Sequence, residues 1–164
     1  MTVTREYLLA VDVGLHTGLA LFTSEGKLLW YRSHHLSSPG KLKRIITHLL
    51  DRAPQPTRLI LEGSGSLADS WFREAERRNL PIRQIHAEDW RNKLLLPRQR
   101  RNGQQAKQSA IKMAGLAIAL LGDKQPTALR HDTAEAVMVG VYGLLELGWL
   151  AGQPLKSLLA KRNG

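Results

Sequence analysis

Four carboxylate residues have types and spacings that could support metal chemistry. They are Asp12 and Glu62, which each accompany an apolar run, and Asp132 and Glu135, which are three residues apart. Burying Asp12 among leucine, valine and alanine would be costly unless a cation or a hydrogen-bond donor met it. A metal ion is one such partner. The alternative is that Asp12 caps the turn after its own strand.

Taken together, the four carboxylates predict a site for hard cations. The chain has no cysteine, which excludes disulfides, thiolate metal sites and a cysteine nucleophile. Carboxylates without thiols suit Mg²⁺ or Mn²⁺ with several water ligands. Two such ions about 3.5 to 4 Å apart would support phosphodiester cleavage. Without metal, the carboxylates would repel one another, which predicts raised pKa values or disorder. For Asp132 and Glu135 alone, the helix dipole and capping are the alternative explanation.

A second candidate feature is a basic segment. The chain carries 24 Lys and Arg against 14 Asp and Glu, a formal net charge of +10. No acidic residue occurs between residues 90 and 122, where the basic side chains are Arg91, Lys93, Arg98, Arg100, Arg101, Lys107 and Lys112. This density predicts a nucleic-acid-binding surface. The alternative is a solvated loop that serves solubility. A membrane surface is disfavoured because residues 97–105 have no aromatic or leucine stripe to insert.

Strands must position the first two carboxylates, and the hydrophobic pattern indicates where these strands lie. A continuous apolar run predicts a buried strand over residues 7–13, followed by a turn and by strands over 19–22 and 27–34. An antiparallel meander is the simplest arrangement of these three. Residues 58–62 repeat the design of the first strand, and residues 81–86 form a short fifth strand after a parallel crossover. In a mixed sheet with the first and fourth strands at its centre, Asp12 and Glu62 become neighbours.

Helices complete the expected α/β fold, a five-stranded mixed sheet flanked by helices. The spacing of apolar residues predicts helices that open near residues 38, 66, 104 and 132 and a helical turn at 87–91. Trp71 and Phe72 are assigned to the core rather than to base stacking. The last helix carries Asp132 and Glu135 in its first turn, from which both could reach the rim of the sheet.

The length and composition predict one compact unit. At 164 residues and 43% hydrophobic, the chain can build one core, which we place in residues 1–150, with 151–164 as a basic C-terminal tail. No apolar run approaches the roughly 18 residues that span a bilayer. No leader with a cleavage site begins the sequence. We therefore expect a soluble, intracellular protein of the cytoplasm.

Three motifs, in their order and spacing, resemble the RuvC-type Holliday junction resolvases, with a style similar to the plant organellar and phage branches. They are LAVDVG (9–14) followed by TGLA (17–20), LEG (61–63), and HDTAEA (131–136) with YG (142–143) downstream. The resemblance runs from about residue 7 to residue 148. The first motif is also similar to the start of actin-like ATPases and sugar kinases. However, 164 residues hold only one lobe of such a protein.

The resemblance implies a ribonuclease H-like fold, a homodimer, and Mg²⁺-dependent nicking of four-way DNA junctions in recombination and repair. By matched position, it implies that Asp12, Glu62, Asp132 and Glu135 hold two Mg²⁺ or Mn²⁺ ions. Lys107 matches a helix lysine near the scissile phosphate. His131 either joins the metal ligands, as a histidine does in some relatives, or contacts backbone at the start of the helix.

The sequence departs from this family at two points. Bacterial resolvases carry an aromatic wedge soon after the second acidic residue, whereas residues 63–66 here are Gly-Ser-Gly-Ser. The fourth ligand is Glu135 rather than an aspartate, a change that its longer side chain can absorb. Two alternatives stay open: an RNA-processing nuclease of the same fold, and a non-catalytic basic module that binds nucleic acid and whose carboxylates only cap helices and form ion pairs.

Overall fold

The computed structural model describes residues 4–36, 38–122 and 129–162, which fold around one five-stranded sheet of order β3-β2-β1-β4-β5. The strands are β1 (Tyr7–Asp12), β2 (His16–Thr23), β3 (Leu28–His35), β4 (Arg58–Glu62) and β5 (Ile82–Ile85). The pairs β1–β2 and β2–β3 are antiparallel, whereas β1–β4 and β4–β5 are parallel. The prediction of three antiparallel and two parallel strands is therefore confirmed.

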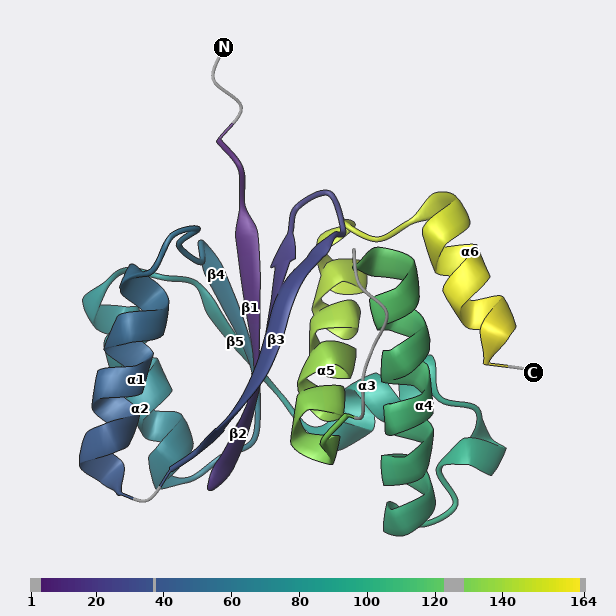
Figure 1. Ribbon diagram of the computed structural model, residues 1–164, viewed down its shortest axis with the longest axis horizontal. Helices are drawn as coiled ribbons and strands as arrows, with labels where there is room; N and C mark the ends of the chain where they lie inside the picture. Colours follow the sequence, from purple (N-terminus) through teal and green to yellow (C-terminus); the bar gives the residue numbers. More distant parts are fainter. Residues whose placement is uncertain (1–3, 37, 123–128, 163–164) are drawn as a thin grey trace.

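Helices cover both faces of the sheet (Figure 1). On one face lie α1 (Pro39–Asp51) and α2 (Ser66–Arg77). The other face is covered by α5 (His131–Leu147), behind which stand α3 (Ala87–Leu94), α4 (Gly103–Leu121) and α6 (Gly152–Lys161). A short 3-10 turn (Pro97–Gln99) joins α3 to α4. No helix within these described residues has the length and hydropathy needed to cross a membrane.

Side chains alternate between the two faces of the sheet along each strand, and this alternation decides towards which helices Asp12 and Glu62 point. Leu9, Val11, Leu59 and Leu61 pack towards α1 and α2, whereas Leu8, Ala10 and Ile60 pack towards α5. Side chains two residues apart on a strand share a face. Asp12 follows Ala10 and Glu62 follows Ile60 at that spacing. Both carboxylates therefore project into the α5 layer.

Helix α5 reaches the sheet closely because β2 carries a glycine at the crossing point. A Cβ atom at Gly18 would lie 1.9 Å from the carbonyl oxygen of Asp132, which no side chain could tolerate. Gly18 is also the register partner of Asp12 across β1 and β2. The first turn of α5 is consequently fixed beside the end of β1.

Two segments differ from the expectations drawn from the sequence. Strand β2 begins at His16 rather than at residue 19, because residues 16–18 pair with residues 33–35 of β3 and lengthen the hairpin. The segment expected as a basic tail forms α6, whose Leu158 is fully buried in the core shared with α4 and α5. Trp71 is fully buried, as predicted for a core residue, and Phe72 is half-buried.

Candidate metal centre

Asp12 and Glu62 stand side by side at the same end of the sheet. They are register partners across the parallel strands β1 and β4, and the sheet continues past them because the Val13 N–H donates to the Glu62 carbonyl oxygen at 3.0 Å. The chain leaves β4 through Gly63, whose φ of +124° is unfavourable for other residues. A Cβ atom there would also lie 3.0 Å from the Cβ of Val13. The glycine after Glu62 thus lets β4 end tightly against β1.

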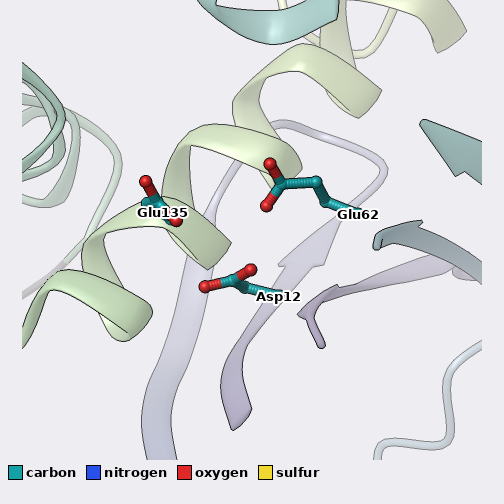
Figure 2. A group of neighbouring side chains, drawn as sticks. All are labelled: Asp12, Glu62 and Glu135. Carbon is teal, nitrogen blue, oxygen red and sulfur yellow. The ribbon is translucent and has the colours of Figure 1, made fainter. Parts of the chain in front are cut away.

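Glu135 completes a cluster of three carboxylates. One oxygen each from Asp12, Glu62 and Glu135 lie within 4.8 Å of one another. Figure 2 shows the three side chains facing a common space, two from strand ends and one from the first turns of α5. Glu62 and Glu135 are only 8% and 7% exposed, so little water is available to stabilise their charges. Three of the four carboxylates singled out in the sequence therefore converge.

The electrostatics of this cluster disfavour three simultaneous negative charges. Burial raises the pKa of Asp12, and a hydrogen bond shared with Glu62 and the charges of Glu62, Glu135 and Asp132 raise it further. Burial likewise raises the pKa of Glu62, although the hydrogen bond with Asp12 and the charge of Arg91 act in the opposite direction. The expected direction of the pKa holds for these two groups, but burial, rather than the repulsion between carboxylates on which the expectation rested, is the largest cause. A cation among the three oxygens would reverse the effect.

Asp132 lies one helical turn before Glu135 and points to β3. It is 2% exposed, and its Oδ2 accepts a hydrogen bond from the Ser33 hydroxyl. Its Oδ1 is buried without a hydrogen-bond partner and lies 3.5 Å from Nε of Arg130. Asp132 is thus outside the three-carboxylate cluster, although its charge contributes to the raised pKa of Asp12. Its role as a metal ligand stays a prediction.

Arg91 brings a positive charge to the cluster. Its Nη2 lies 2.9 Å from Oε1 of Glu135, and the two side chains are 22% and 10% exposed. The guanidinium also stacks 5.4 Å from the ring centre of Trp90, which is fully buried. From the sequence, Arg91 was assigned only to the nucleic-acid-binding segment. The structure shows that it also balances part of the carboxylate charge.

The other basic residues of this segment are distributed over α3, the 3-10 turn and α4. Lys93, Arg98, Arg101, Lys107 and Lys112 are exposed, whereas Arg100 is half-buried. Arg91 and Arg100 line one hollow between α3 and the start of α4, together with Asn92, Asn102 and Glu88. The hollow connects the basic segment to the carboxylate cluster through Arg91. The position of Lys107 near a scissile phosphate stays a prediction.

Sequence reasoning did not find the polar residues of β2, β3 and the start of α5. Ser33 contacts Asp132, and Arg130 Nη2 lies 3.1 Å from Nδ1 of His16. The rings of His16 and His35 are 4.4 Å apart and nearly perpendicular. His131, by contrast, is exposed at the first position of α5. The sequence signal for this group is the mixture of polar and apolar residues in β3, where Arg32, Ser33, His34 and His35 follow one another.

The residues present fit a divalent cation. Oxygen donors from Asp12, Glu62 and Glu135 come together without a nitrogen or sulfur ligand, which is the donor set that Mg²⁺ and Mn²⁺ prefer. The buried Oδ1 of Asp132, which lacks a hydrogen-bond donor, offers a further acceptor near the same helix turn. The net excess of carboxylate over nearby basic groups also favours a bound cation.

No protein-family model and no curated protein matches the sequence. Among solved structures, Thermus thermophilus RuvC in complex with a Holliday junction substrate matches with a TM-score of 0.62 and 13% identity, over 87% of this chain and 96% of that chain. A second structure of Thermus thermophilus RuvC matches with a TM-score of 0.55 and 12% identity, over the same shares of both chains. At these identities the likeness concerns the fold. The chain therefore adopts the ribonuclease H-like fold of RuvC.

Proposed function

We propose that this protein is a metal-dependent, structure-selective endonuclease that nicks four-way DNA junctions. The observation that carries the proposal is the convergence of Asp12, Glu62 and Glu135 at the end of β1, within a fold similar to that of RuvC. The neighbour was solved with a Holliday junction substrate, which supports branched DNA as the substrate class. The formal charge of +10 supports a polyanionic partner as well.

The three clustered carboxylates would hold a divalent cation, and Asp132 would contribute to a second one. When bound, Mg²⁺ or Mn²⁺ supplies Lewis-acid activation of the phosphodiester and of the attacking water. Around it, the buried walls of β1, β4 and α5 limit the access of bulk water, which strengthens every charge interaction in the site. Arg91 neutralises Glu135 from the α3 side and lies in the hollow that leads to the basic segment.

The basic segment would hold the DNA backbone while the carboxylates act on one phosphate. Exposed Arg98, Arg101 and Lys107 can each contact a phosphate without disturbing the core. Symmetric nicking of a junction needs two active sites, so we include a homodimer in the proposal. Light scattering coupled to size-exclusion chromatography measures the molar mass and thereby distinguishes a homodimer from a monomer. Such an enzyme would act on recombination and repair intermediates in the cytoplasm.

The test is incubation of the protein with a synthetic four-way junction, with and without Mg²⁺, beside a linear duplex of the same sequence. We expect Mg²⁺-dependent nicks in the junction, and their loss in Asp12→Asn with DNA binding retained or tightened, because a charge that repels phosphate is removed. Asp69→Asn, an exposed aspartate on α2, is the matched control and should cleave normally.

Three results would contradict the proposal. Cleavage of a structured RNA in preference to the junction would identify the substrate as RNA. Binding of the junction without cutting under any divalent cation would favour a non-catalytic module. Equal cleavage by wild type and Asp12→Asn would remove the carboxylate cluster from the reaction.

A further inference from the structure

The turn between β1 and β2 exposes a large apolar side chain close to the carboxylate cluster. Leu15 is 65% exposed, against 43% for Leu29 and 36% for Ile111, the other exposed large apolar side chains of the described residues. It follows Asp12 by three residues, so the two Cα atoms are at most about 11 Å apart. An apolar group held in water beside a charged site has no role in the core of this chain.

The backbone that carries Leu15 is fixed. The Thr17 hydroxyl donates to the Gly14 carbonyl oxygen at 2.8 Å, and Thr17 itself is only 3% exposed. On the other side, the Leu36 N–H donates to the Leu15 carbonyl oxygen at 2.7 Å and ties the turn to the end of β3. A partner would therefore meet Leu15 in a prepared position, without first ordering a mobile loop.

The residue that follows Leu15 belongs to a group of two imidazole rings and a guanidinium. His16 follows Leu15, and its ring lies 4.4 Å from the ring of His35 at 80°. Nη2 of Arg130 lies 3.1 Å from Nδ1 of His16, and the Arg130 side chain is 62% exposed. Both histidines are exposed as well. We call Leu15, His16, His35 and Arg130 the tip cluster.

This combination of groups matches the chemistry of an unstacked nucleotide. Leucine side chains are used as wedges between base steps, and histidine rings and arginine planes stack on bases that have left the helix. A guanidinium in addition binds phosphate oxygens. A protein partner would be met by an apolar face, whereas here a single exposed leucine is followed in the chain by a group of imidazole and guanidinium side chains. Charge complementarity therefore favours a nucleic-acid strand.

We propose that the tip cluster binds a nucleotide unstacked from the DNA within about three positions of the scissile phosphate. That number follows from the span of at most about 11 Å between the Cα atoms of Asp12 and Leu15 and the rise of about 3.4 Å per nucleotide along one strand. The inference rests on the proposed nuclease function of the neighbouring carboxylates. The tip cluster would thereby discriminate branched from linear DNA, because extruding a base from a regular duplex is more costly than extruding one from a distorted duplex.

The test places 2-aminopurine, whose fluorescence rises when it unstacks, at each of the three positions on either side of the nick in a four-way junction. Asp12→Asn, which binds without cutting, should raise the fluorescence at one or two of them. Asp12→Asn combined with Leu15→Ala should lose that rise, whereas Asp12→Asn with Leu29→Ala should keep it. Leu29 is the matched exposed leucine, on β3.

A second readout uses cleavage. We expect Leu15→Ala to cut the regular junction at least about tenfold more slowly than wild type, and to recover on a junction with a mismatch at the responsive position, since that base is already unpaired. An equal loss on both substrates, or unchanged stacking at all six positions, would overturn the role of the tip cluster. Junction cleavage with unchanged stacking would leave the proposed function intact. Unstacking without Mg²⁺-dependent cutting would instead overturn the proposed function and support the binding site.

Discussion

Nη2 of Arg91 lies 2.9 Å from Oε1 of Glu135, so the third carboxylate of the cluster is shared between a guanidinium from α3 and the two carboxylates at the strand ends. Both side chains are largely buried, which makes this pair different from the exposed ion pairs on the surface. A divalent cation in the cluster would bind the same carboxylate. The Arg91–Glu135 ion pair and cation binding are therefore energetically coupled.

Replacing Arg91 by methionine should destabilise the metal-free protein by about 1–3 kcal/mol, because Glu135 loses its buried donor. Saturating Mg²⁺ should remove much of this loss, since the cation supplies the missing charge. Thermal unfolding in EDTA and in Mg²⁺ measures both effects. Arg83→Met is the control, because its pair with Glu146 is 52% and 40% exposed and should contribute little. An identical response to Mg²⁺ in wild type and Arg91→Met would contradict the coupling.

Asp12→Asn should stabilise the metal-free protein at neutral pH. The pKa of Asp12 is raised above its ordinary value of 3.8, so its contribution to stability is complete below that pH and is lost as the pH rises towards the raised pKa. In EDTA, the melting temperature of the wild type should therefore fall relative to that of Asp12→Asn between about pH 4 and pH 8. The variant should also lose the stabilisation by Mg²⁺, about 2.7 kcal/mol at a hundredfold excess over Kd.

Comparing the pH dependence of the melting temperature in wild type and in Asp12→Asn separates the effect of Asp12 from that of the other titrating groups. Hydrogen bonds from Arg77 and Arg78 lower the pKa of Glu74 to about 2, so its contribution is present above its ordinary value of 4.5 and is lost as the pH falls towards 2. That acid-side loss is common to wild type and Asp12→Asn. Parallel pH profiles for the two proteins would be inconsistent with a raised pKa at Asp12.

Gly18→Ala should disrupt the carboxylate cluster by displacing the backbone of α5. The added methyl would lie 1.9 Å from the Asp132 carbonyl oxygen, so α5 would have to move away from β2 and carry Glu135 with it. We expect a loss of at least about 1–3 kcal/mol, as in overpacked cores, together with weaker Mg²⁺ stabilisation. Gly40→Ala in α1 meets no atom within 4 Å and should be neutral or slightly stabilising. Normal Mg²⁺ binding by a stable Gly18→Ala protein would show that the close approach is not required.

Neutralising Arg98 and Arg101 together should weaken DNA binding and lower its dependence on salt. Both are exposed, unlike Arg100, so their replacement by glutamine should leave the melting temperature unchanged. Each phosphate contact that is lost should reduce the slope of log K against log salt by about 0.9. Titration of a labelled junction at several salt concentrations measures the slope. The control is Lys41→Gln with Arg44→Gln, two exposed basic residues of α1 on the other face of the sheet, whose replacement should leave the slope unchanged. An unchanged slope would exclude this segment from the interface.

The sequence by itself determined the order of the five strands and of most helices, and it placed Asp12 and Glu62 at neighbouring positions of the sheet. A continuous apolar run that ends in a carboxylate, used twice, predicted two central strands with Asp12 and Glu62 at the same rim. The spacing of apolar residues predicted α5 with its acidic first turn. These features depend on periodicity and on residues near one another in the chain, which is why they can be read locally.

The tertiary structure decided which groups meet. Whether Glu135 or Asp132 faces Asp12 depends on the rotation of α5 about its axis, which the close approach at Gly18 and the contact with Ser33 fix. The pairing of Arg91 with Glu135 depends on how α3 packs against α5, and the length of β2 depends on its pairing with β3. Such contacts join residues far apart in the sequence, and their energies depend on burial that only the folded chain creates.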